Sequence, residues 1–182
     1  QEAVIAGTVS DSTGAVLPGV PVTATLAATG NRFEVVTDGR GAYRALVIYN
    51  EGENFSVGAN LALAMFSINI AMWDAIEQSV ADGQATYAAL QRAPFPVVAA
   101  PAGMAFGGGT EIVLHADAVQ ASAETNMGLV ETGVGIVPGW GRCKEMVLRH
   151  VGPVQSDPAK AMAMTGQIFQ TIAMAKTSTS AA

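Results

Sequence analysis

Hydrophobic and polar positions change their pattern once along the 182-residue chain. From 4 to about 43 the sequence is rich in Gly, Thr, Val and Pro, and in the run VPVTAT at 20–25 apolar residues alternate with Pro and Thr. Alternation with a period of two predicts a strand with one buried face. Turn-forming residues at 11–14, 18–19 and 37–41 separate such runs. The first part is therefore predicted to form short antiparallel strands joined by tight turns.

The pattern after residue 45 is typical of an α/β structure. ALVIYN at 45–50 and FPVVAAPAG at 95–103 are short continuous apolar runs, as expected of strands that are covered on both faces. Between them, 60–92 is dominated by good helix formers. Asp82 and Gly83 predict a break that divides this stretch into two helices.

Further helices are expected in the last third of the chain. TEIVLHA at 110–116 predicts a short helix with its apolar residues inside, and 159–175 predicts a longer one after a linker at 153–158. In RCKEMVLRH at 142–150, four positions recur at i, i+3, i+4 and i+7, which predicts one apolar stripe of a helix. The residues of that stripe are Cys143, Met146, Val147 and His150. We interpret His115 and His150 as packing or surface residues.

Composition and charge narrow the classes of function. Only 13% of the residues are charged and the formal net charge is −6, which excludes the basic surface that nucleic acids or anionic membranes require. The most apolar stretch, 61–73, is shorter than the roughly 20 residues that cross a bilayer, so no transmembrane segment is predicted. The single cysteine excludes an internal disulfide and a Cys/His metal cluster. Neutral small molecules or proteins are the expected partners, and an anionic ligand would have to be held by local Arg, Lys or backbone N–H groups. The sequence leaves homo-oligomerisation open.

The first part resembles a known family. GTVSDSTGAVLPGVPVTAT at 7–25, followed by TDGRGAYRAL at 37–46, is similar to the carboxypeptidase regulatory-like domain, a small prealbumin-like β-sandwich. The resemblance covers about 3–46 and implies an incomplete sandwich, because the further strands of that family are replaced by the α/β pattern. The family is common at the N-termini of secreted and outer-membrane proteins.

Two glycine-bearing segments carry candidate chemistry. GENFSVGANL at 52–61 and MAFGGGTE at 104–111 each follow a predicted strand and precede a predicted helix. Backbone N–H groups at a helix N-terminus favour negative charge, and glycine lets the backbone approach a ligand closely. Two such loops facing one another would hold an oxyanion between two N–H donors.

Two glutamates stand in comparable surroundings. Glu111 follows the glycines of the second loop, and Glu131 lies among apolar and glycine residues in MGLVETGVGIVPGWG at 127–141. Burial raises the pKa of a carboxyl group, and two neighbouring carboxyl groups push their pKa values apart. One can then hold a proton while the other accepts one, which is the requirement for adding water across an activated double bond.

The order of these three segments resembles the crotonase (enoyl-CoA hydratase/isomerase) superfamily, in particular the hydratase region of bifunctional proteins that also carry a 3-hydroxyacyl-CoA dehydrogenase. The match covers about 45–150 and continues more weakly to 182. It implies that the backbone N–H groups of Ala59 and Gly108 form an oxyanion hole for a thioester carbonyl. It also implies that Glu111 and Glu131 hold and activate water. The implied ligand is an acyl-CoA thioester, so coenzyme A enters as part of the substrate and neither a resident cofactor nor a metal is expected.

The expected fold class is α/β, a crotonase-like ββα spiral, incomplete, preceded by a short antiparallel β-sandwich-like segment. The expected division is a β-rich, incomplete carboxypeptidase regulatory-like segment at 1–44 and a crotonase-like segment at 45–182, truncated at both ends. Three positions depart from the family pattern: Asn60 where Asp is usual, Thr110 where Cys is common, and Arg142 where close relatives tend to have glycine. None of these departures removes a proposed catalytic group.

The resulting hypothesis is an enoyl-CoA hydratase-like protein whose activity depends on how much of the site survives truncation. Two alternatives remain open: a secreted or envelope-associated binding or structural protein that uses the sandwich-like segment, and a non-catalytic mosaic of two families. The chain does not begin with Met, which fits signal-peptide cleavage or a chosen boundary equally. Localisation is cytoplasmic under the crotonase hypothesis, and secreted or envelope-associated under the first alternative.

Overall fold

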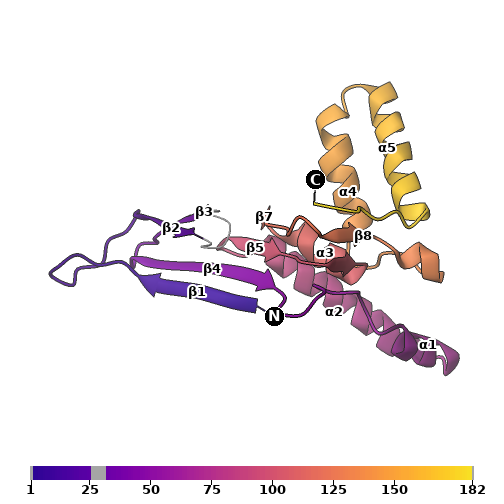
Figure 1. Ribbon diagram of the computed structural model, residues 1–182, viewed down its shortest axis with the longest axis horizontal. Helices are drawn as coiled ribbons and strands as arrows, with labels where there is room; N and C mark the ends of the chain where they lie inside the picture. Colours follow the sequence, from indigo (N-terminus) through magenta and orange to yellow (C-terminus); the bar gives the residue numbers. More distant parts are fainter. Residues whose placement is uncertain (1, 26–31, 182) are drawn as a thin grey trace.

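A four-stranded sheet runs through the centre of the protein, for which a computed structural model describes residues 2–25 and 32–181. Its strands lie in the order β1 (Glu2–Thr8), β4 (Ala42–Tyr49), β5 (Val97–Ala100) and β7 (Ala118–Val119). β1 is antiparallel to β4, whereas β4, β5 and β7 are parallel to one another. The β1–β4 ribbon projects from one end of the molecule (Figure 1).

A second, shorter parallel layer follows the first. It contains β6 (Met104–Phe106) and β8 (Asn126–Gly128), and Ser56 joins β6 through a parallel bridge to Ala105. The chain therefore passes three times from the first layer to the second and then into a helical segment. These segments are α1 (Leu61–Asn69) with α2 (Trp73–Gln91), then α3 (Gly108–His115), then the short helix η1 (Glu131–Val134). This repetition confirms the predicted ββα spiral.

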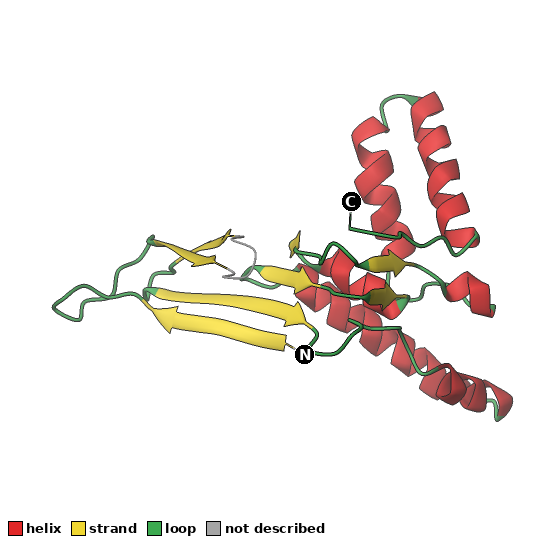
Figure 2. Ribbon diagram, in the orientation of Figure 1, coloured by secondary structure: helices red, strands yellow, loops and turns green. Residues whose placement is uncertain are grey.

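The N-terminal part contributes to the central sheet and also forms a separate pair. β2 (Pro21–Thr25) and β3 (Arg32–Val36) make an antiparallel two-stranded sheet, as the alternating pattern at 20–25 predicted. The predicted boundary at 44–45 falls inside β4, which pairs with β1 on one side and β5 on the other (Figure 2). The resemblance to a β-sandwich domain, and the division into two segments, stay predictions.

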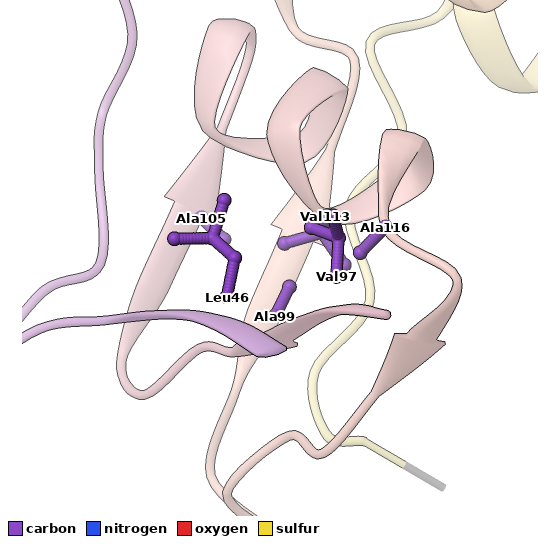
Figure 3. Packing of buried hydrophobic residues seen from close by; sticks show 6 residues of the cluster. All are labelled: Leu46, Val97, Ala99, Ala105, Val113 and Ala116. Atoms are coloured by element: carbon purple, nitrogen blue, oxygen red, sulfur yellow. The ribbon is translucent and has the colours of Figure 1, made fainter. Parts of the chain in front are cut away.

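The buried core lies where β4, β5, β6 and α3 meet. Val97, Val98 and Ala99 of β5 are all at most 2% exposed, because both faces of this strand are covered, as its continuous apolar run predicted. Burying a valine side chain stabilises the fold by about 1.5–3 kcal/mol. The cluster that packs together consists of Leu46, Val97, Ala99, Ala105, Val113 and Ala116 (Figure 3).

The break in the long helical stretch lies earlier than the sequence predicted. α1 begins at the side chain of Asn60, which accepts a hydrogen bond from the N–H of Leu63 at 3.1 Å, and the chain turns at Ala71, where φ is +57°. α2 then runs through Gly83 without interruption, so the predicted break at 82–83 is wrong. A Cβ atom at Gly83 would overlap the Trp140 ring. The glycine therefore serves close packing against a distant segment, which outweighs its modest helix propensity.

The last two helices stand side by side at one end of the molecule (Figure 1). α4 (Arg142–Val151) leads through the short helix η2 (Gly152–Val154) into α5 (Pro158–Ala173), which confirms the long helix predicted at 159–175. No helix within the described parts of the chain is both long and apolar enough to cross a membrane.

The apolar stripe predicted along α4 is largely exposed. Cys143, Val147 and His150 are exposed, and the buried residues of the helix are instead Arg142 and Glu145. The reason is that the first turn of α4 packs against α3 through a polar contact. The Nε atom of Arg142 donates a hydrogen bond to the side chain of His115 in α3. The spacing of apolar residues along a helix does not predict such polar contacts.

Candidate active site

The three turns of the spiral end beside one another. The N–H of Phe106 donates to the carbonyl oxygen of Ser56 at 2.8 Å, and the N–H of Gly107 donates to that of Gly128 at 2.9 Å. These bonds hold the second-layer segments in register. The residues that follow them, which include Ala59, Gly108 and Glu131, therefore emerge at the same edge of the layer.

The two predicted oxyanion loops lie in contact. A Cβ atom built on Gly58 would be 3.4 Å from the backbone nitrogen of Gly108, so the residue before Ala59 packs directly against the start of α3. Gly108 is the first residue of α3, and its N–H has no acceptor within the helix. Its neighbour Gly109 is required for this approach, because a Cβ atom there would overlap the carbonyl oxygen of Ser56.

Thr110 fixes the direction of α3. Its hydroxyl oxygen lies 2.5 Å from the carbonyl oxygen of Ala105 and accepts a hydrogen bond from the N–H of Gly128 at 2.9 Å. The side chain thus ties the helix to both strands of the second layer. This departure from the family pattern serves a structural purpose.

Glu111 is a buried carboxyl group with two backbone donors. Its side chain is 1% exposed, and Oε1 accepts hydrogen bonds from the N–H groups of Trp140 at 3.1 Å and Arg142 at 3.4 Å. Burial and the nearby charge of Glu131 raise the pKa of Glu111 to about 7, against the lowering effect of the two N–H donors. The group therefore exchanges a proton close to neutral pH.

The carboxyl group of Glu131 has fewer hydrogen bonds to the described residues than that of Glu111. Its Oε2 is buried and has no hydrogen-bond partner among the described residues, and its Oε1 lies 3.0 Å from the position of a Cβ atom built on Gly107. The carboxyl group thus rests against the residue that precedes Gly108. Burial raises the pKa of Glu131. The charge of Glu131 in turn raises the pKa of Glu111, so protonation of Glu131 favours ionisation of Glu111.

Next to Glu111 lies a cluster of polar and aromatic residues, which consists of Tyr87, His115, Trp140 and Arg142. Tyr87 of α2 stacks on His115 with ring centroids 5.1 Å apart and meets the Trp140 ring edge to face at 5.2 Å. His115 is buried, in agreement with a packing role, and His150 is exposed. The sequence analysis did not assign roles to Tyr87, Trp140 or Arg142. A signal existed for the last two, because Trp140 lies in the glycine-rich segment of Glu131 at 127–141 and Arg142 directly follows it.

Of the four predicted site residues, Ala59 and Gly108 belong to the two glycine loops, and Glu111 and Glu131 supply the carboxyl groups. The spiral places the two loops and the two carboxyl groups together. A separate cavity of about 290 Å³ lies on another side of α3, and none of the four lines it. Within 2–25 and 32–181, no group of three or more His, Cys, Asp or Glu residues is arranged to hold a metal ion. The raised pKa values of Glu111 and Glu131 and the backbone N–H of Gly108 at the start of α3 suit proton transfer next to an N–H donor.

Comparison with known proteins is consistent with this geometry. The sequence model of the enoyl-CoA hydratase/isomerase family matches residues 27–176. A probable 3-hydroxyacyl-CoA dehydrogenase of Bacillus subtilis (strain 168) is 45% identical over 139 residues, which are 76% of this chain and 17% of that protein. A Rickettsia felis protein assigned as a fatty acid oxidation complex trifunctional enzyme is 38% identical over 115 residues, which are 63% of this chain and 15% of that protein.

Solved structures share the fold. An enoyl-CoA hydratase from Polaromonas sp. JS666 superimposes with a TM-score of 0.62 at 23% identity, over 75% of this chain and 48% of that one. A Thermobifida fusca YX protein assigned as an enoyl-CoA hydratase, in complex with acetoacetyl-CoA, gives a TM-score of 0.55 at 24% identity, over 72% and 49%. The chain spans about a sixth of the two curated relatives and about half of these two structures. The family match nevertheless extends over most of the chain, which therefore belongs to the enoyl-CoA hydratase/isomerase family of the crotonase superfamily.

Proposed function

We propose that the protein binds an acyl-CoA thioester and adds water across the C2=C3 bond of an enoyl-CoA. Family membership supports the substrate class, and so does the acetoacetyl-CoA complex of the Thermobifida fusca relative. The observation that carries the proposal is the pair Glu111 and Glu131, one buried and one half-buried, whose pKa values are both raised. A pair that shares one proton supplies both the base and the acid that hydration needs.

The oxyanion loops supply the electrostatic part of the mechanism. The thioester oxygen lies between the N–H groups of Ala59 and Gly108. These donors stabilise the negative charge that develops on that oxygen as the C2=C3 electrons shift towards C2 and the carbonyl. Losing one such donor typically costs about 10²–10³ in rate.

The two glutamates carry out the proton transfers as a pair. One of them, in its ionised form, accepts a proton from water as the water oxygen bonds to C3, and the other, in its protonated form, gives its proton to C2. Water is thereby consumed, the C2=C3 bond becomes single, and the pair ends with one proton, which has moved from one glutamate to the other.

The test is the loss of enoyl-thioester absorbance with crotonyl-CoA at pH 7. Glu111→Gln and Glu131→Gln each keep the size of the side chain and remove one proton-transfer group, so each is expected to slow hydration by about 10²–10⁴-fold. Glu124→Gln is the matched control, because Glu124 is exposed and lies outside the site, and its rate should equal that of the wild type. A wild-type protein no faster than the Glu111→Gln, Glu131→Gln double variant would overturn the proposal.

A further inference from the structure

The indole ring of Trp140 lies between two helices to which Trp140 itself does not belong. A Cβ atom built on Gly83 of α2 would overlap the five-membered part of the ring, at Nε1 and Cδ1. A Cβ atom built on Gly108 of α3 would lie 2.6 Å from Cζ3, on the six-membered part. Because both positions are glycines, the ring can approach both backbones this closely. One aromatic side chain thus bridges α2 and the first residue of α3.

The backbone around Trp140 is bound to the same two helices. The side-chain amide of Gln84 in α2 donates a hydrogen bond to the carbonyl oxygen of Gly139 at 2.7 Å. On the α3 side, the N–H of Trp140 donates to Oε1 of Glu111 at 3.1 Å. Gly141 then turns the chain with φ at +108°, a conformation that other residues rarely adopt. The segment 139–141 is therefore held between α2 and α3 by its backbone as well as by the ring.

Tyr87, one turn after Gly83 on α2, extends this packing along α3. Its ring meets the Trp140 ring edge to face, with centroids 5.2 Å apart, and stacks on His115 with centroids 5.1 Å apart. Aromatic pairs with these geometries are favourable beyond the area that they bury. His115 is the last residue of α3 and Gly108 is the first. The two aromatic rings therefore contact α3 at both of its ends.

The end of α3 that Trp140 contacts carries two groups of the proposed site. The ring packs on Gly108, whose N–H has no acceptor within the helix, and the Trp140 N–H binds the carboxyl group of Glu111 one turn later. An oxyanion donor stabilises developing charge only when it is held in place before the reaction. A displacement of about 1 Å in such a group costs on the order of 10²-fold in rate. A residue that contacts both groups at once therefore sets their relative position.

We propose that Trp140 is a positioning residue, whose indole ring holds the N–H of Gly108 in line with the carboxyl group of Glu111 by filling the space between α2 and α3. This inference rests on the proposed function for its catalytic consequence. The contact between the ring and Gly108 is a property of the folded chain and is measurable without substrate.

The first measurement is the ¹H–¹⁵N NMR signal of the Gly108 N–H in the full chain. An aromatic ring shifts the resonances of nuclei beside it, so Trp140→Ala should move this signal and Trp140→Phe should move it less. Gly83→Ala places a methyl group in the indole ring and should also move the signal. In the Trp140→Ala background Gly83→Ala should leave it in place, because the methyl group then meets no ring. Gly166→Ala, where a Cβ atom meets open space, is the matched control and should not move it.

Hydration of crotonyl-CoA by the same variants gives the catalytic readout, with rates expressed per folded chain. Trp140→Ala should lower kcat about 10²-fold, because the oxyanion donor is displaced from the carboxyl group. KM should change by less than about threefold, because these groups act on charge that develops in the transition state. Gly83→Ala should lower kcat about fivefold when Trp140 is present and less than about twofold in the Trp140→Ala background. Gly166→Ala should keep the rate of the wild type.

Three results would overturn the proposal: a Gly108 signal that Trp140→Ala leaves in place, equal losses from Gly83→Ala with and without the indole ring, and a loss confined to KM. If Trp140→Ala does not fold, Trp140→Phe takes its place, and the effect of Gly83→Ala should be smaller in that background than in the wild type. Displaced Gly108 signals in a chain whose wild type hydrates nothing would contradict the proposed function, while the positioning of Gly108 by Trp140 would stand.

Discussion

Two neighbouring helices, α3 of the spiral and α4 after it, differ in which residues they bury. α3 buries Val113 against the sheet at 1% exposure, as its apolar run predicted. α4 leaves Val147 38% and Leu148 57% exposed and buries charged residues at its start. The contrast teaches that apolar periodicity predicts burial where a helix covers a sheet, and fails where a helix meets the protein through a polar contact.

The surroundings of the two helices explain the difference. α3 is enclosed by β5, β6 and α2, so nearly all its side chains have neighbours. α4 contacts α3 mainly through its first turn and otherwise lies beside α5, away from the sheet (Figure 1). The start of α4 therefore contacts the carboxyl group of Glu111 through the backbone N–H of Arg142. The rest of the helix has little apolar surface to cover.

The largest expected effect separates two valines. Val113→Ala removes two methyl groups from a filled core and should lower the free energy of unfolding by about 2–3 kcal/mol. Val147→Ala makes the same chemical change on the open side of α4 and should alter it by less than about 0.5 kcal/mol. Urea unfolding of both variants checks this. Equal losses would show that α4 is as closely packed as α3.

The second comparison concerns the buried glutamates of the two helices. The folded-state pKa of Glu111 is raised above 4.5 to about 7, so the stability it contributes is full below pH 4.5 and is lost as the pH rises through 7. Glu111→Gln should therefore raise the free energy of unfolding at pH 8, and the gain should be about 2 kcal/mol larger at pH 8 than at pH 5. Urea midpoints at the two pH values measure this.

Glu145 should behave in the opposite way. Burial alone would raise the pKa of Glu145, but hydrogen bonds from Lys144 and Gln91 outweigh it and the net pKa is lowered. Its contribution is therefore present above pH 4.5 and is lost as the pH falls through its folded-state pKa. Glu145→Gln should slightly destabilise the protein at pH 7 and have less effect at acid pH. Variants of both residues that respond alike to pH would contradict the contrast.

The smallest effect distinguishes two helical glycines. Gly166 of α5 has open space where a Cβ atom would stand, so Gly166→Ala should stabilise the protein by about 0.5–1 kcal/mol. Gly83→Ala brings a methyl group into the Trp140 ring and should destabilise it by about 1 kcal/mol or more. Thermal unfolding of the two variants gives the signs. Stabilisation by both would mean that Trp140 does not pack on α2.

Local sequence signals predicted much of the framework. The run at 95–103 predicted β5, and the alternation at 20–25 predicted β2. The glycine loops and the two glutamates were identified because their order along the chain resembles the crotonase superfamily, and in the structure Gly108 follows β6 and Glu131 follows β8. Contacts within one turn of the spiral leave such a regular trace in the sequence.

Long-range packing left no comparable trace. The break expected at Asp82 and Gly83 is absent, since Gly83 makes room for Trp140, a partner 57 positions later that no local pattern reveals. Arg142 was noticed only as a departure from glycine, and its burial follows from the position of His115 on another helix. Tyr87 belongs to the site only because α2 passes beside α3.

The central claim is that the N–H groups of Ala59 and Gly108 hold a thioester oxygen beside the two glutamates. Infrared difference spectroscopy of butyryl-CoA labelled with ¹³C at the thioester carbonyl tests it directly, because hydrogen bonding to that oxygen lowers its stretching frequency. The frequency should fall when the thioester binds to the wild type, and Ala59→Pro, which removes one donor, should reverse part of the shift. A bound carbonyl whose frequency equals that of the free thioester in water, or a shift that Ala59→Pro leaves intact, would contradict the claim.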